Sequence, residues 1–227
     1  MKLLSVNVGR PRPNPWKGKQ GTGGRTGIDK RPVEGPVAVA APVHEGTGEV
    51  GLAGDRAYDV AHHGGADQAV YAYAREDLDG WQRELGVPLA NGAFGENLTT
   101  CGIDVNGAVI GERWRVGAEV VLEVSCPRLP CATFQGWMGR NGWNREFTRA
   151  GLPGAYLRVI TPGEIRAGDP VVVVHRPAHG VSVGHTFRAV MTEAKLLPSL
   201  LDVAELPENV RELARKRIEG GKAGAGG

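Results

Sequence analysis

The sequence has no long hydrophobic run, no strong excess of either charge and only three cysteines. The longest apolar runs span a few residues, such as PVVVV at 170–174, so no membrane-spanning segment of about 20 residues is expected. A net charge of +2 does not favour nucleic acid or anionic lipid as a partner. The N-terminal apolar stretch is too short for a signal peptide, and we expect a cytoplasmic protein without a membrane partner.

The three cysteines are Cys101, Cys126 and Cys131. Without an export signal, a disulfide framework is not expected. Cys126 and Cys131 are separated by four residues, whereas structural zinc sites usually combine a C-x₂-C pair with a second pair. At this point the segment SCPRLPCATF at 125–134 has three interpretations: half of a metal site, a disulfide, or a single thiol held for chemistry.

Short alternating apolar segments separated by glycine turns dominate the first three quarters of the chain. They predict strands at 3–9, 36–45, within 92–124, at 154–160 and at 170–175. Residues 10–27 and 51–65 contain many glycines, prolines or both and are expected to form loops. Residues 68–85 begin as a strand and end as an amphipathic helix on which Leu78, Trp81 and Leu85 share one face. A second helix is predicted at 134–149.

The sequence pattern changes after Pro177. Two or three short helices are predicted there, followed by a glycine-rich tail. We therefore expect a mainly β, α+β fold: a β-barrel domain with flanking helices at 1–177, a small helical subdomain at 178–219 and a disordered tail at 220–227.

Cys131 has the local surroundings of a reactive thiol. It follows Pro130, and Arg128 lies three residues earlier. A nearby guanidinium group favours the thiolate, which is the form that binds a soft metal or attacks an electrophile. Cys126 ends an alternating run and is interpreted as a strand residue, and Cys101 lies in a turn. A buried structural cysteine is the alternative for each of them.

Three other stretches carry candidate site residues. HHGGADQAVYAY at 62–73 places His63 and Asp67 on either side of paired glycines, and GAFGENLTT at 92–100 contains Asn97. GRTGIDKRPVEG at 24–35 holds Arg25, Lys30 and Arg31, which form a plausible anion-binding loop, and Arg56 is a further candidate for it. The alternatives are simple glycine turns and a solvated basic loop.

Together these stretches resemble the MOSC domain, the module also found at the C-terminus of molybdenum cofactor sulfurases, in its bacterial YiiM-like branch. The resemblance extends from about residue 3 to residue 215. It rests on the ordered set SVNVGRPR, TGIDKRPVEG, GLAGDRAYD, HHGGADQAVYAY, GAFGENLTT, IGERWRVGAEVVLEVSCPRLPC and PGAYLRVITPGEIRAGDPV, followed by the helical segment.

The resemblance implies a β-barrel with a C-terminal helical subdomain, the molybdenum cofactor (Mo-molybdopterin) and reduction of N-hydroxylated compounds. It implies that Cys131 ligates the metal and that Asp67, or else His63, handles protons. Residues near the cofactor would be Lys30, Arg31, Arg56, Asn97 and Arg128. Many relatives have lysine at the position of Gln68, so cofactor affinity is expected to depend on this difference.

The resemblance supplies no electron donor, and the chain has no iron–sulfur cysteine spacing. A separate reductase or ferredoxin-like partner is therefore implied. Two alternatives stay open: a sulfur carrier that holds a persulfide on Cys131, and a protein that holds the cofactor without catalysis. The physiological substrate and the oligomeric state are not predicted.

Overall fold

The computed structural model describes residues 1–16, 24–44, 46–61 and 63–224, with the side chains of 221–224 left aside. The strands are β1 (Lys2–Pro13), β2 (Arg25–Pro32), β3 (Val37–Val39), β4 (Val70–Ala74), β5 (Leu98–Cys101), β6 (Arg113–Val116), β7 (Val120–Pro127), β8 (Ala155–Thr161), β9 (Gly163–Ile165) and β10 (Val171–His175). The helices are η1 (Ala66–Gln68), α1 (Arg75–Leu85), α2 (Ala132–Met138), α3 (Trp143–Ala150), α4 (Val183–Met191), η2 (Ala194–Leu200) and α5 (Glu208–Gly224).

Eight strands form one mixed sheet in the order β10-β6-β7-β8-β4-β5-β1-β2, and β3 pairs with β9 in a second, two-stranded sheet. The large sheet curls, because Lys2 at the start of β1 forms an isolated bridge with Pro170 just before β10. Backbone hydrogen bonds between Leu3 and Asp169 and between Val171 and Met1 join the same segments, so the sheet is barrel-like without a closed ladder. The mainly β, α+β prediction is therefore confirmed, and among the described residues the barrel is incomplete.

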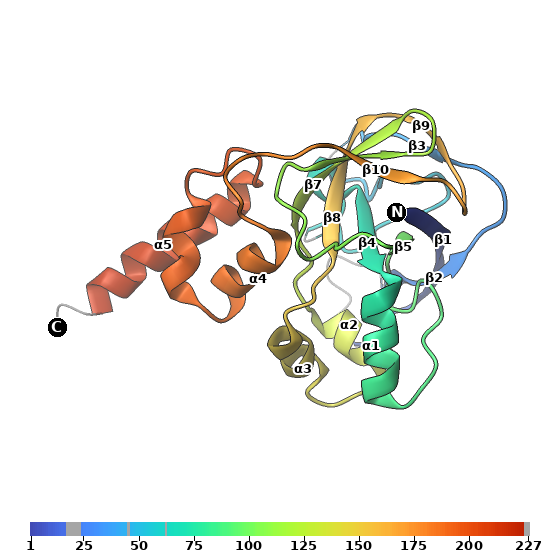
Figure 1. Cartoon of the computed structure of the whole chain (residues 1–227). Helices are drawn as coiled ribbons and strands as arrows, with labels where there is room; N and C mark the ends of the chain where they lie inside the picture. The colour runs from blue at the N-terminus through green and yellow to red at the C-terminus, as the bar shows by residue number, and fades with distance from the viewer. Residues whose placement is uncertain (17–23, 45, 62, 225–227) are drawn as a thin grey trace.

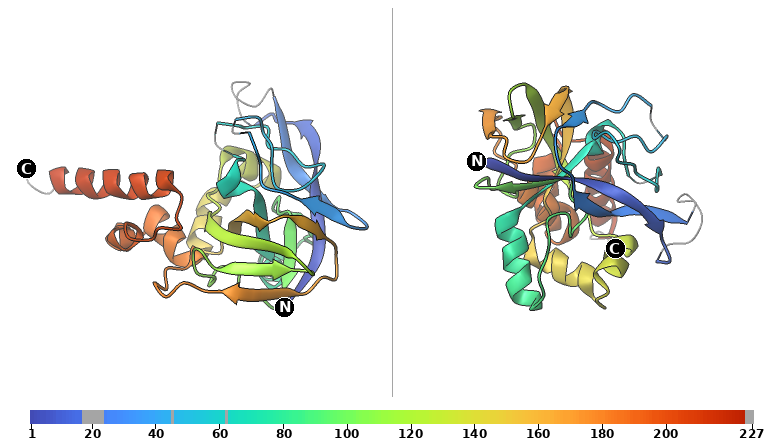
Figure 2. Two further views of the ribbon diagram at one scale, coloured as in Figure 1. Left: turned by 90° about the horizontal axis from the view of Figure 1, so that it is seen from above. Right: turned by 90° about the vertical axis from the view of Figure 1, so that its right-hand side faces the viewer.

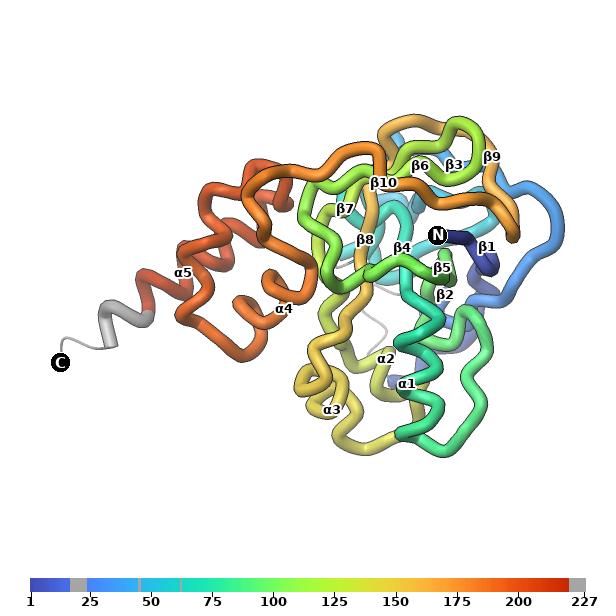
Figure 3. Tube along the Cα trace, viewed as in Figure 1, coloured from blue at the N-terminus to red at the C-terminus, as the bar shows by residue number. Residues whose placement is uncertain are grey.

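Helices α1, α2 and α3 lie together at one end of the sheet, and α4, η2 and α5 lie to one side of it (Figures 1 and 3). A bridge between Val109 and Ser182 and a hydrogen bond from the Val183 amide to the Ala108 carbonyl attach α4 to the sheet. The predicted helices after Pro177 are present. Helix α5 includes residues 220–224 of the predicted tail, and the division of the chain at residue 177 stays a prediction.

The core has two parts. A mainly aliphatic cluster, which also contains Trp114, fills the inside of the curled sheet and extends to α4 and α5. A separate aromatic cluster lies under α1, α2 and α3 and includes Trp81, Phe94, Phe134, Trp143 and Phe147. The predicted apolar face of α1 supplies the buried Leu78 and Trp81 to it. The aromatic cluster matters for function because it fixes the position of α2, which follows Cys131.

Three sequence-based predictions need correction. The predicted loop at 10–27 is in part a β-hairpin, because β1 continues to Pro13 and β2 begins at Arg25. The strand predicted at 36–45 is limited to Val37–Val39. The helix predicted at 134–149 is divided into α2 and α3, because Gly139 and Gly142 both adopt positive φ angles and interrupt it.

Candidate functional site

Cys131 lies at the junction between β7 and α2. It occupies the position before the first residue of α2, with an extended backbone at φ −134° and ψ 171°. Pro130 restricts the preceding backbone, and the Cys131 carbonyl accepts a hydrogen bond from the Gln135 amide at 3.0 Å. The end of β7 and the start of α2 therefore hold the thiol from both sides.

Arg128 is a buried cation beneath this loop. Its guanidinium carbon lies 3.6 Å from the centroid of the Phe134 ring, and Nη1 donates to the Phe94 carbonyl at 3.2 Å. The side chain is 6% exposed, so its charge acts through a poorly solvated environment. Arg128 links the aromatic cluster to the loop that carries Cys131.

The Cys131 thiol is more acidic than an ordinary cysteine. Burial by itself raises its pKa, but a hydrogen bond from His63, the charge of Arg128 and the backbone amide of Phe134 act in the opposite direction and lower it to about 7. A substantial fraction of Cys131 is therefore thiolate at neutral pH. Thiolate is the state required of a soft-metal ligand or a nucleophile.

The other two cysteines differ from Cys131. Burial raises the pKa of Cys126 to about 11, and Cys126 lies inside β7. A hydrogen bond to Glu76 raises the pKa of Cys101. All three cysteines are free, and no cluster of His, Cys, Asp or Glu suited to a metal ion occurs among the described residues. Within that part of the chain, the disulfide and zinc interpretations of the 125–134 segment find no support.

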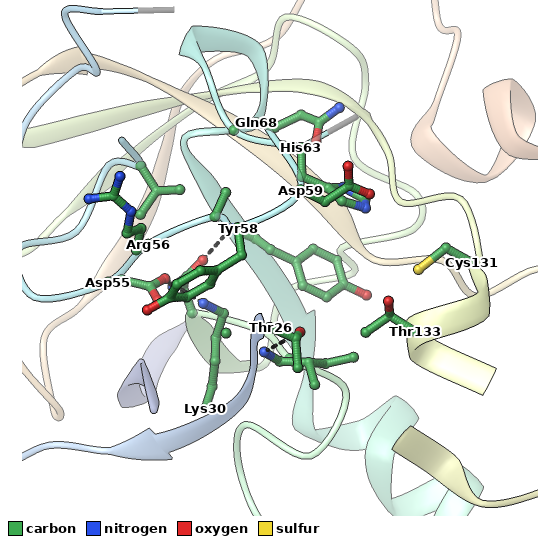
Figure 4. Close-up of a pocket in the computed structure, with 18 of the residues that line it drawn as sticks. Thr26, Lys30, Asp55, Arg56, Tyr58, Asp59, His63, Gln68, Cys131 and Thr133 are labelled. Atoms are coloured by element: carbon green, nitrogen blue, oxygen red, sulfur yellow. Dashed lines mark hydrogen bonds and ion pairs between the residues drawn. The ribbon is translucent and has the colours of Figure 1, made fainter. Parts of the chain in front are cut away.

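A pocket beside Cys131, here called the polar pocket, is lined by residues that include Arg25, Thr26, Lys30, Asp55, Arg56 and Cys131. In Figure 4 the Cys131 sulfur points toward the centre of this pocket. His63 and Asp59 lie across from it, and Lys30 and Asp55 occupy the far side. Segments from β2, the loop at 50–64 and the start of α2 thus meet around one thiol.

Lys30 is less available to an anion than its charge indicates, because its ammonium group forms an ion pair with Asp55. Asp55 is almost fully buried and also accepts a hydrogen bond from Asn97 Nδ2 at 2.6 Å and one from the Gly9 amide at 3.0 Å. The Asn97 Oδ1 atom accepts from the Tyr71 amide at 3.1 Å. Lys30 and Asn97, both predicted to contact the cofactor, line the pocket but are held by partners within the protein.

The remaining predicted cations occupy different places. Arg31 is half exposed, pairs with Asp29 at 2.6 Å and does not line the polar pocket. Arg56 does line it and donates to the Thr47 carbonyl at 2.8 Å. Arg25, at the start of β2, is a further exposed arginine that lines it. Arg25 and Arg56 are therefore better placed for an anionic ligand than Lys30 or Arg31.

A second pocket opens on the other side of Cys131. It is here called the apolar pocket after the side chains of Val60, Leu129, Val190, Val210 and Leu213, and polar side chains such as Asp67 and Asn209 line it as well. Helices α4 and α5 supply part of the wall, so the C-terminal helices contribute to the site. Cys131, His63, Gly64, Gln68 and Tyr156 line both pockets. The thiol consequently lies between the two pockets and lines both of them.

Asp67 lines the apolar pocket but is not a free carboxylate. Its Oδ1 atom accepts a hydrogen bond from Arg158 Nε at 2.6 Å. Arg158 Nη1 also contacts Glu123 at 3.1 Å and the Glu205 carbonyl at 2.8 Å. Arg158 thus connects Asp67 to the helical segment. Of the two predicted proton-handling residues, His63 is the one in contact with Cys131.

Sequence reasoning did not identify Asp55 or Arg158 as site residues. Asp55 belongs to the GDR segment, where only Arg56 was chosen, and Arg158 lies inside a predicted strand. Their partners are 25 and 91 residues away along the chain, so no local pattern marks them. An acidic residue directly before a candidate cation was the available signal for Asp55.

Comparisons with known proteins point to one family. The MOSC domain family model matches residues 59–172. The chain is 33% identical over 218 residues to the uncharacterized protein YflK of Bacillus subtilis, covering 95% of this chain and 93% of that protein. The crystal structure of YiiM from Geobacillus stearothermophilus superposes with a TM-score of 0.75 at 28% identity, covering 96% of this chain and 98% of the other.

A fungal relative is considerably longer. A protein of Gibberella moniliformis named a reductase is 30% identical over 225 residues, which represent 95% of this chain but only 37% of the fungal protein. Among the described residues, no helix combines the length and the hydrophobicity that crossing a membrane requires.

Proposed function

The chain belongs to the MOSC domain family, with YiiM-like relatives, and on this premise we propose that it binds the molybdenum cofactor through Cys131 and reduces N-hydroxylated compounds. The observation that carries the proposal is the position of Cys131, a thiol with a pKa of about 7 that lines two adjoining pockets. One chamber suits an anionic cofactor, and the other suits an organic substrate.

The residues present fit the cofactor. Its metal is soft enough to take a thiolate ligand, and Cys131 is the acidic thiol of the site. Its pterin carries a phosphate, for which Arg25 and Arg56 are exposed donors in the polar pocket. Lys30 adds less charge than expected because Asp55 neutralises it. Gln68, which lines both pockets, has a buried Oε1 atom with no hydrogen-bond partner among the described residues.

The reaction requires a proton source next to the thiol. Conversion of R–NH–OH to R–NH₂ consumes two electrons and two protons and releases one water molecule. When bound, the cofactor would supply the redox chemistry of this step. The chain's own contribution would come from His63, whose imidazole contacts Cys131 and lines both chambers. Asp67 would act indirectly, since Arg158 holds its carboxylate.

The apolar pocket supports an organic substrate with an apolar body. Valine, leucine and proline side chains form part of its wall, against which a hydrocarbon or aromatic group of the substrate would pack. Because α4 and α5 contribute Val190, Val210 and Leu213, the helical segment would help to select the substrate. An aromatic amidoxime or hydroxylamine matches this chemistry better than a charged one.

Electrons would arrive from another protein. Nothing in the described part of the chain resembles a redox cofactor site of its own. This chain matches 37% of the fungal protein named a reductase. We propose that a separate donor protein supplies the electrons.

An activity assay on cofactor-loaded protein tests the proposal. Benzamidoxime and a chemical one-electron donor are supplied under anaerobic conditions, and benzamidine is measured. We expect turnover by the wild type, loss in Cys131→Ser and retention in Cys126→Ser. Loaded protein that reduces neither benzamidoxime nor an N-hydroxylated base would contradict the proposal. A stable persulfide on Cys131 of metal-free protein would instead favour sulfur transfer.

A further inference from the structure

The hairpin formed by β1 and β2 concentrates positive charge. By sequence, residues 10–31 contain seven lysines and arginines and a single acid, Asp29. This segment therefore carries a net charge of +6, and the remaining residues carry −4, since the whole chain has +2. Of the described residues of this segment, Arg10, Arg12, Arg25 and Arg31 are exposed. These four arginines lie on the two strands β1 and β2, which run side by side (Figure 2).

The guanidinium groups of the hairpin are held in place. Asp29 is buried beneath them and pairs with Arg31 at 2.6 Å and with Arg12 at 3.4 Å. Pro11 and Pro13 restrict the backbone of β1 in the same region. One buried carboxylate thus positions two exposed cations without cancelling the charge of the patch. A surface of this kind loses little conformational freedom when a partner binds.

The same hairpin lies against the helix that follows Cys131. Asn14 Nδ2 donates to Thr133 Oγ1 at 3.0 Å, and Arg12 lies over the Trp137 ring at 5.9 Å from its centroid. The Trp16 ring packs directly on the backbone of Gly136. A partner bound to the hairpin would therefore lie beside the element that carries the reactive thiol.

We propose that the basic hairpin β1–β2, through Arg10, Arg12 and Arg31, is the docking surface for an acidic electron-transfer protein. The inference rests on the proposed function, since it names the surface that receives the donor. Arg10 and Arg31 do not line the polar pocket, so the anionic cofactor leaves them available. A nucleic acid fits less well, because a long polyanion would also meet the negative remainder of the chain.

Binding is measured first, because it does not depend on activity. An acidic [2Fe–2S] ferredoxin serves as the probe against cofactor-loaded wild type, the double variant Arg10→Gln/Arg31→Gln and the control Arg83→Gln/Arg149→Gln. The control removes the same charge from exposed arginines of α1 and α3. At low ionic strength we expect Kd to rise about fivefold or more in the hairpin variant, with little change in the control. The difference should disappear at about 0.5 M NaCl.

Activity with two donors then separates this inference from the proposed function. With reduced ferredoxin, the hairpin variant should show a raised KM for the donor. With a small chemical donor it should match the wild type. No activity with either donor, combined with charge-dependent ferredoxin binding, would reject the proposed function and leave the docking surface intact.

Three results would overturn the docking surface. One is the absence of ferredoxin binding at low ionic strength, and another is an equal Kd for the wild type and the hairpin variant. The third is binding of a short DNA duplex, lost in the hairpin variant, without binding of ferredoxin. That last result would assign the hairpin to nucleic acid.

Discussion

His63 and Cys131 line the same two pockets, and the imidazole of His63 lowers the pKa of the Cys131 thiol. In metal-free protein carrying Cys101→Ser and Cys126→Ser, the rate of alkylation by iodoacetamide should rise with pH around a midpoint near 7. His63→Gln should move the midpoint upward, because burial is then opposed mainly by the charge of Arg128 and the Phe134 amide. His185→Gln, which changes a histidine outside both pockets, is the control. An unchanged midpoint in His63→Gln would show that the imidazole does not stabilise the thiolate.

Gly136 and Gly80 form a matched pair of helical glycines. A Cβ at Gly136 would overlap the Trp16 ring, whereas at Gly80 the nearest atom is 3.9 Å away. Gly80→Ala should raise the free energy of unfolding by about 0.5–1 kcal/mol, since alanine is the better helix former. Gly136→Ala should lower it by about 1–3 kcal/mol because Trp16 must move. Urea denaturation measures both, and stabilisation by both substitutions would refute the packing of the hairpin on α2.

Asp77 should make the fold less stable at neutral pH. Burial, followed by the charge of Asp104, raises its pKa to about 6 in the folded protein. Because the folded state then binds the proton more tightly than the unfolded chain, stability is lost as pH rises through 6. Asp77→Asn, which can keep a contact with Asn106, should raise the free energy of unfolding by roughly 1–2 kcal/mol at pH 8, allowing for partial solvent exposure. The gain should shrink progressively below pH 6, and a gain that is independent of pH would contradict the mechanism.

Local sequence patterns were sufficient to predict much of the fold. The alternation at 3–9 and the apolar face of Leu78 and Trp81 reflect each element's own contact with the core, so the strand and α1 could be predicted. The hairpin arms at 10–13 and 25–27 could not be predicted. Proline and glycine usually mark loops, and here they occur where β1 extends past its pairing with β5 and pairs with β2 across the hairpin.

In the site, too, some features could be predicted from local sequence and others could not. Cys131 and His63 stand out because their own segments carry unusual chemistry. Lys30 forms an ion pair with Asp55, and Asp67 forms one with Arg158. Each pair joins distant segments, and a single sequence gives no sign of such pairs. The apolar wall contributed by Leu213 likewise depends on how the C-terminal helices pack. Residue chemistry is therefore visible in the sequence, whereas the availability of each charge depends on the fold.

The most direct measurement is elemental analysis for molybdenum, tungsten and zinc on protein produced in a host that makes the molybdenum cofactor. The wild type, Cys131→Ser and Cys126→Ser are compared. We predict near-stoichiometric molybdenum in the wild type and in Cys126→Ser, and its loss in Cys131→Ser, because only Cys131 combines a low pKa with access to both pockets. Molybdenum retained by Cys131→Ser, or zinc lost equally from both cysteine variants, would contradict the assignment of Cys131 as the metal ligand.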